Sequence, residues 1–202
     1  MAIKQVTTTK FLGVHIDAKL TWRDHISNIS KTISRNVGIL FKLKHFLPRN
    51  ILITLYQTLI IPHLNYCSIV WSGANSSCLN QLTILQKRAV RHITHAGPRD
   101  NSPLFIKFKL LKFTDVIDFN IAVFTCKAWN RLLPDRTTFH NFIISNTLVH
   151  RHDTRHANFA YRHYYRTNIG SFSLRNRSTK MWNNPHRLNK SSSSLFIFKK
   201  AV

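Results

Sequence analysis

The hydrophobic period of the chain changes at Trp22. Residues 6–16 carry Val, Thr, Phe and Ile around one glycine, which is typical of a short strand or β-hairpin with a bend. After Trp22, apolar residues recur about every 3.6 positions, so residues 22–47 are expected to form an amphipathic helix. We therefore expect a mainly α protein that begins with a short N-terminal β element.

A helical bundle is expected after this element. Helices are predicted at residues 22–47, from Pro48 to Pro62, at 79–93 and at 116–133. Ser76 or Ser77 is expected to cap the third helix, and Thr114 with Asp115 the fourth. The connections are short, which favours neighbouring helices packed into one bundle.

The sequence changes character after residue 134. In residues 135–202 the period weakens, and His150, His152, His156 and His163 alternate with arginines and with Phe159, Tyr161, Tyr164 and Tyr165. Interleaved basic and aromatic residues suit single-stranded nucleic acid. A loosely structured polycationic tail accounts for the same composition. A third interpretation, a metal site on His150-Arg151-His152, has no cysteine nearby to support it.

Charge indicates the partner. Thirty Lys and Arg oppose seven acidic residues, all Asp, for a formal charge of +23. Such an excess is best tolerated when a polyanion neutralises it, so nucleic acid is the leading candidate. An anionic membrane, or an acidic partner domain on another segment, would also balance the charge. No apolar run reaches the roughly 18 residues of a membrane span, and no signal-peptide core is present. We expect an intracellular protein, nuclear or cytoplasmic, that is not secreted.

The basic residues fall on helix faces. Lys31, Arg35 and Lys42 lie opposite the apolar stripe of the first helix, which has no acid of its own after Asp24. Lys87, Arg88 and Arg91 cluster in the last turns of the third, beyond what the helix dipole requires. We predict that these six residues, with Arg155 and Arg162 of the tail, contact nucleic acid. The three cysteines are widely and irregularly spaced, so they predict neither a disulfide framework nor a metal knuckle. No metal site and no cofactor are expected in this chain.

Several motifs resemble one family. Lys10-Phe11-Leu12-Gly13-Val14-x-Ile16-Asp17, continuing to Trp22-x-x-His25-Ile26, resembles the block that follows the polymerase palm in reverse transcriptases of non-LTR (LINE-type) retrotransposons, especially the jockey and CR1 groups. The similarity extends through Leu55 to Trp71, Leu85 to Ile93, Thr154-Arg155 and Trp182-Asn183. It implies that residues 1–21 are a primer-grip-like element with Phe11, Leu12, Gly13 and Val14 at the primer. Residues 22–134 would be a thumb-like bundle and residues 135–202 the distal basic region.

The resemblance also defines what to expect of catalysis. Family polymerases bind Mg²⁺ on a palm with an Ala-Asp-Asp signature upstream of this block, and here no Asp adjoins another. We expect part of an RNA-directed DNA polymerase that binds RNA and RNA/DNA template-primer duplex, works with a missing palm and fingers domain, and is inactive alone. The alternatives are a decayed transposon-derived fragment without activity and a domesticated basic RNA-binding module.

Overall fold

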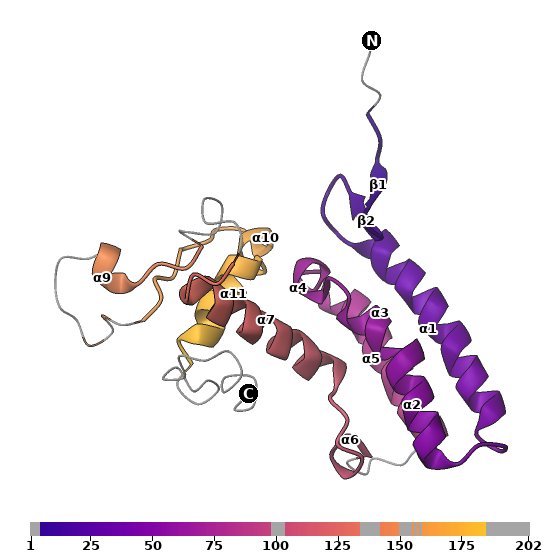
Figure 1. The fold of residues 1–202 in the computed structure, drawn as a ribbon. Coiled ribbons are helices and arrows are strands. Elements are labelled where there is room, and N and C mark those ends of the chain that lie inside the picture. The colour runs from indigo at the N-terminus through magenta and orange to yellow at the C-terminus, as the bar shows by residue number, and fades with distance from the viewer. Residues whose placement is uncertain are drawn as a thin grey trace. The chain divides into compact units, whose positions relative to one another are not determined.

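The computed structural model describes residues 5–97, 104–133, 142–149, 155, 157 and 159–184. The chain divides into two compact units, Met1–Ile117 and Asp118–Val202, and each is described by itself (Figure 1). The first unit contains β1 (Thr8–Phe11), β2 (Val14–Asp17), α1 (Arg23–Leu43), α2 (Arg49–Leu59), α3 (Ile61–Asn65), α4 (Ser68–Trp71), α5 (Ser76–Thr94) and α6 (Leu104–Lys107). Helix α7 (Phe113–Trp129) begins in the first unit and continues in the second, which also contains α9 (Asn146–Val149), α10 (Asn168–Ser171) and α11 (Leu174–Trp182).

The expected fold class is confirmed: a two-stranded antiparallel hairpin precedes a chain that is mainly helical. The two units meet within α7, at Ile117 and Asp118, whereas the sequence placed a boundary after residue 134. The division of function between residues 1–21, 22–134 and 135–202 stays a prediction. In the described part of the C-terminal range, short helices and one isolated β-bridge are present.

The hairpin has a two-residue loop. Phe11 pairs with Val14, which leaves Leu12 and Gly13 as the loop, with φ angles of 46° and 81°. Two consecutive positive φ angles are the pattern of a type I′ turn, whose twist matches the flanking strands. Gly13, which lies among the strand-forming residues of the sequence, therefore forms part of the turn that separates β1 from β2.

The core of the first unit lies between α1, α2 and α5. The stripe predicted for α1 is buried at Ile26, Ile33, Val37 and Leu40 and half-buried at Ile29. The stripe predicted for α5 is buried at Leu82, Leu85, Ala89 and Ile93 and half-buried at Leu79. Trp71 of α4 is fully buried, and its ring stacks on that of Phe113 with centroids 5.9 Å apart. The spacing of apolar residues thus predicted the buried faces of α1 and α5 correctly.

The helix boundaries differ from the prediction in several places. Helix α1 ends at Leu43 rather than at residue 47, and Pro48 precedes α2 instead of lying in its first turn. Asn75 caps α5, because its Oδ1 accepts a hydrogen bond from the Ser77 backbone N–H at 3.2 Å. The predicted caps Ser76 and Ser77 are therefore already inside this helix.

Helix α7 also starts earlier than its predicted cap. It begins at Phe113, and the backbone N–H of Phe113 donates to Gln86 Oε1 at 2.7 Å. A side chain from α5 therefore satisfies a donor that helix ends normally leave free. Thr114 and Asp115, predicted to cap the helix, lie in its first turn.

The second unit has a small core of its own. Ala122, Cys126, Ala160 and Trp182 are buried together, with Trp129, Ile143 and Met181 packed against them. The rings of Trp129 and Trp182 are 5.2 Å apart. Trp182 belongs to the Trp-Asn pair that resembles the retrotransposon family, and its burial gives this residue a structural role.

None of the helices in the described ranges is both long and apolar enough to cross a membrane.

Candidate nucleic-acid interface

Helices α1 and α5 lie side by side and run in the same direction. Near their C-terminal ends, the Phe41 and His92 rings are 5.1 Å apart, and just beyond them those of His45 and His95 are 6.4 Å apart. Towards their N-terminal ends, Gln81 of α5 lines the same depression as residues 27–35 of α1. Because the pair is parallel, polar residues from two separate sequence segments line one depression.

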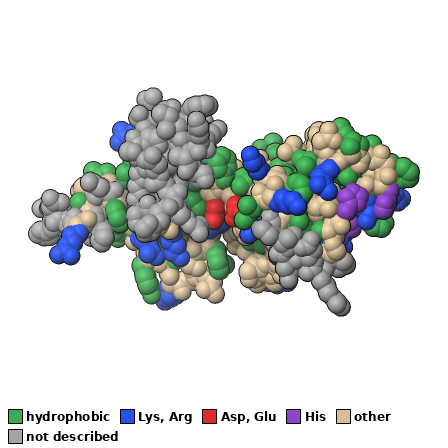
Figure 2. Space-filling view, turned by 90° about the horizontal axis from the view of Figure 1, so that it is seen from below, with side chains coloured by type: hydrophobic (Ala, Val, Ile, Leu, Met, Phe, Trp, Pro, Cys, Tyr) green, Lys and Arg blue, Asp and Glu red, His purple; other side chains and the backbone are tan. Residues whose placement is uncertain are grey.

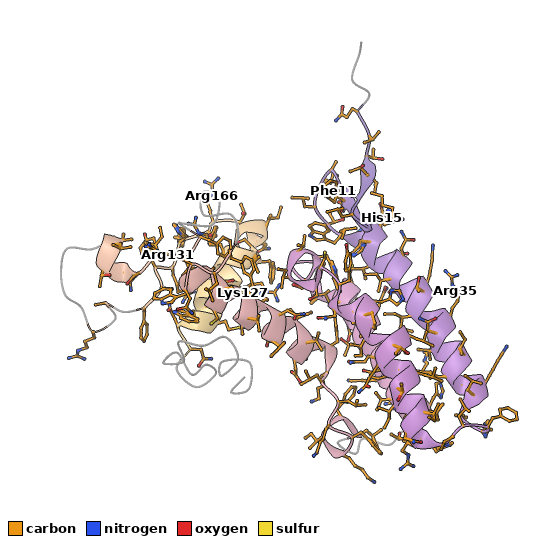
Figure 3. All side chains as sticks on the ribbon, viewed as in Figure 1. Phe11, His15, Arg35, Lys127, Arg131 and Arg166 are labelled. Carbon is orange, nitrogen blue, oxygen red and sulfur yellow. The ribbon has the colours of Figure 1, made fainter. Side chains whose placement is uncertain are left out.

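The basic groove between these helices is an open depression of about 510 Å³. It is lined by Ser27, Ser30, Lys31, Ser34, Arg35 and Gln81. The set combines two cations with three hydroxyls and an amide, and it contains no carboxylate. Hydroxyl, amide and cationic groups are the usual donors to phosphate oxygens. Figure 3 shows Arg35 projecting from α1 away from the neighbouring helices.

One atom in the lining of the basic groove is unsatisfied. Ser30 Oγ is buried and has no hydrogen-bond partner among the described residues. An unpaired buried polar atom costs free energy, about 1–3 kcal/mol, which a ligand oxygen would offset. Arg35 Nε contacts the Lys31 carbonyl oxygen at 3.5 Å, which leaves the terminal nitrogens of the guanidinium for other partners.

Two more of the predicted cations extend this surface. Lys42 follows Lys31 by eleven residues and Arg88 follows Gln81 by seven, so each lies within about 20° of the earlier residue around its helix. Burial, and then the charges of Lys44 and Arg88, lower the pKa of His92. Figure 2 shows Lys and Arg side chains next to histidines on the viewed face.

The other two predicted cations of α5, Lys87 and Arg91, do not line the groove. Lys87 lies about 120° around the helix from Gln81, so it is turned away, and it is exposed. Arg91 lies about 80° from Gln81 on the same side as Lys87 and is half-buried. Lys31 and Arg35 therefore line the groove, helix geometry puts Lys42 and Arg88 on the same sides of α1 and α5, and Lys87 stands apart.

The hairpin is fixed to the helices at several points. The Tyr66 hydroxyl donates to the Leu12 carbonyl oxygen at 2.7 Å, and Thr8 Oγ1 donates to Asp24 Oδ2 at 2.9 Å. Phe11 and Leu12 are 63% and 73% exposed, whereas Val14 is buried. An apolar tip is thus presented to solvent on a held backbone, and the Val14 side chain contributes to packing (Figure 3 labels Phe11).

Asp17 joins the hairpin to α1. Its carboxylate accepts hydrogen bonds from the Thr21 N–H at 2.8 Å, the Thr21 hydroxyl at 3.0 Å and the Trp22 N–H at 2.8 Å. Burial acts to raise the pKa of Asp17, but these hydrogen bonds outweigh it and the pKa is lowered. The ionised carboxylate therefore sets the direction in which α1 leaves the hairpin.

His25 is a buried residue that the sequence analysis did not single out. Its Nδ1 accepts a hydrogen bond from the His15 backbone N–H at 3.4 Å, and its ring meets Trp71 edge-on at 5.6 Å. Burial, and then the nearby His15, lower its pKa, so the ring is neutral at pH 7. The available signal was its place in the Trp22-x-x-His25-Ile26 motif.

The predicted residues of the C-terminal range lie in the second unit. Arg155 and Arg162 are both exposed there. The suggested metal site on His150-Arg151-His152 lies outside the described residues. Within the described ranges, no three His, Cys or Asp side chains are close enough to hold a metal ion.

Taken together, the first unit presents a carboxylate-free basic groove and an apolar hairpin tip on a held backbone. Over 92 residues, the chain is 35% identical to the RNA-directed DNA polymerase from mobile element jockey of Drosophila melanogaster, which covers 43% of this chain. The aligned part is 10% of that polymerase, so the chain spans about a tenth of its length. No family model matches the chain, and no solved structure matches it. The chain thus contains a region related to a non-LTR reverse transcriptase.

Proposed function

We propose that the first unit binds a template-primer duplex through the basic groove. Lys31 and Arg35 would contact phosphates, and the hydroxyls and the Gln81 amide would donate to neighbouring phosphate oxygens. Lys42 and Arg88 would extend the contact along the duplex. The observation that carries this proposal is the groove itself, in which α1 supplies two cations and three hydroxyls, α5 supplies an amide, and no lining residue is acidic. The relation to the jockey polymerase supports an RNA template.

The hairpin would orient the primer end. Its tip is held by Tyr66 and its base by the start of α1, so Phe11 and Leu12 can act as a fixed apolar guide. Positioning of this kind lowers a reaction barrier only when a catalytic group is supplied. The chemistry would come from a palm domain with its own Mg²⁺, because no two Asp residues adjoin in this sequence. We expect no nucleotide incorporation by this chain alone.

The test compares two charge reversals of equal size. Lys31→Glu/Arg35→Glu changes the groove, whereas Lys109→Glu/Lys112→Glu changes exposed lysines in the α6–α7 connection. Both variants have the same net charge, so a difference between them reports position. Binding of a fluorescent RNA/DNA template-primer is measured by anisotropy across a salt series.

The wild type and Lys109→Glu/Lys112→Glu should show the same slope of log K against log salt. Each phosphate contact contributes about 0.9 to the slope of log K against log salt, so the groove variant should lose about 1.8. Equal effects of the two variants would contradict the proposal and would instead favour an unspecific polycation, as expected of a decayed transposon fragment.

A further inference from the structure

Residues 160–166 of the second unit form an extended segment with a fixed start. The Asn183 side chain donates to the Ala160 carbonyl oxygen and accepts from the Ala160 N–H, both at 2.8 Å. The Tyr161 N–H donates to the Ile144 carbonyl oxygen at 2.7 Å. The amide of Asn183 thus replaces a neighbouring strand and holds the backbone in place.

One side of this segment is a ladder of rings. The rings of Tyr161 and His163 are 5.0 Å apart, and those of His163 and Tyr165 are 6.3 Å apart. All three residues are half-buried. Tyr165 also packs on Gly170, where a Cβ atom would lie only 2.6 Å from Tyr165 Cδ1. Contact between rings two residues apart shows that the backbone is extended and that these side chains share one face.

The alternate residues point the other way. Arg162, Tyr164 and Arg166 are exposed, and Tyr164 is 92% exposed. An extended chain rises about 3.3 Å per residue, so the two arginines stand about 13 Å apart with the tyrosine ring between them. Figure 3 labels Arg166, whose side chain projects from the ribbon. The structure therefore separates the aromatic residues of this region into packed rings and one free ring.

We propose that Arg162, Tyr164 and Arg166 form a binding site for an unpaired nucleic-acid strand. Tyr164 stacks on one base, and the two arginines contact the phosphates on either side. A duplex offers no free base face to such a ring, whereas a single strand does. This site lies in a different unit from the basic groove and takes the unpaired part of a nucleic acid, so it goes beyond the template-primer proposal.

The first experiment measures binding of the full chain to labelled oligouridine of about 12 nucleotides, a length typical of single-strand sites. Stacking of a base on an aromatic ring predicts roughly 5- to 150-fold weaker binding for Tyr164→Ala. Tyr164→Phe keeps the ring and should bind like the wild type. Phe172→Ala removes another exposed ring of the same unit and serves as the matched control.

Three results with the variants would overturn the proposal. They are unchanged binding by Tyr164→Ala, equal losses for Tyr164→Ala and Phe172→Ala, and a loss for Tyr164→Phe as large as that for Tyr164→Ala. Circular dichroism of each variant shows whether it is folded. Polyphosphate, which has charge but no bases, serves as a competitor for labelled oligouridine. If it displaces the label from wild type and from Tyr164→Ala equally well, and binds both with the affinity of oligouridine, stacking is refuted.

The arginines and the supporting ladder give independent readouts. Arg162→Gln/Arg166→Gln should reduce the salt slope for oligouridine by about 1.4, at about 0.7 per phosphate contact. Gly170→Ala should weaken oligouridine binding although Gly170 contacts no ligand, because its Cβ displaces Tyr165. An unaltered salt slope in the double variant would remove the phosphate contacts from the proposal.

Failure of this proposal is distinguishable from failure of the groove proposal. Tyr164→Ala should leave binding of a blunt template-primer duplex unchanged, and Lys31→Glu/Arg35→Glu should leave the effect of Tyr164→Ala on oligouridine unchanged. Cross-linking of iodouridine-substituted strand, mapped by mass spectrometry, should label the peptide that contains Tyr164. Labelling confined to α1 and α5 would assign single strands to the basic groove instead.

Discussion

Replacement of Gln86 by methionine tests how much the hydrogen bonds of this one side chain stabilise the packing of α2, α5 and α7. Gln86 is 1% exposed, and its Nε2 donates to the Tyr56 hydroxyl at 2.8 Å and to the Leu111 carbonyl oxygen at 2.9 Å. Its Oε1 accepts from the Phe113 N–H at 2.7 Å. One amide therefore links α5 to α2 and to the start of α7. Burial raises the pKa of Tyr56 to about 12 despite this hydrogen bond, so the phenol remains neutral.

The magnitude follows from the groups that lose a partner. Gln86→Met keeps the length and approximate volume of the side chain, but it leaves the buried Tyr56 hydroxyl and the buried Phe113 N–H unpaired. Each such group costs about 1–3 kcal/mol, so we expect a loss of about 2–6 kcal/mol in the free energy of unfolding. Domains of this size have only about 5–15 kcal/mol in total.

Urea unfolding followed by circular dichroism, with hydrogen exchange of α5 amides, measures this loss. Gln81→Met changes the same residue type on the same helix at an exposed position, and its effect should lie within about 0.5 kcal/mol of zero. If the two methionine variants are equally stable, the role assigned to the Gln86 hydrogen bonds is wrong.

Three further predictions concern single residues. Because the folded pKa of His25 is lowered, the unfolded state binds more protons below about pH 6.5, so stability should fall as pH drops through that range. His25→Asn should flatten this dependence in urea titrations, and an unchanged slope would contradict it. Gly13→Ala should lower the free energy of unfolding by about 1 kcal/mol in thermal unfolding, because φ is 81° at this position. The added Cβ would meet no close atom, since the nearest, on Tyr66, is 3.7 Å away, so an unchanged stability would contradict backbone strain in the turn. Asn183→Leu should speed amide exchange around Ala160, and equal exchange would show that its two hydrogen bonds are dispensable.

Local pattern was sufficient for much of the fold. A period of about 3.6 identified the buried faces of α1 and α5, and the change of period at Trp22 located the junction of hairpin and helix. The helix ends were less predictable, because caps depend on which side chain reaches a free N–H. Asn75 reaches the start of α5, and Gln86 reaches the start of α7 from another helix.

The site could be predicted only in part. The sequence placed Lys31 and Arg35 on a polar helix face, but a groove exists only because α5 lies parallel to α1 and adds Gln81. Hydrophobic period does not specify which helices become neighbours or in which direction they run. Lys87 was grouped with Arg88 because the two adjoin in the sequence, although helix geometry separates them by about 100°. The hydrogen-bonding roles of His25, Gln86 and Asn183 depend on contacts between distant segments, which a single sequence does not display.

Lysine acylation in the presence of a template-primer duplex tests the central claim most directly. Mass spectrometry would compare the reaction rates of individual lysines with and without the duplex. We predict that Lys31 and Lys42 are protected, whereas Lys87, turned away on α5, and Lys109, in the α6–α7 connection, react as in the free protein. Uniform protection of all four lysines, or an unprotected Lys31, would contradict a duplex-binding surface built from α1 and α5.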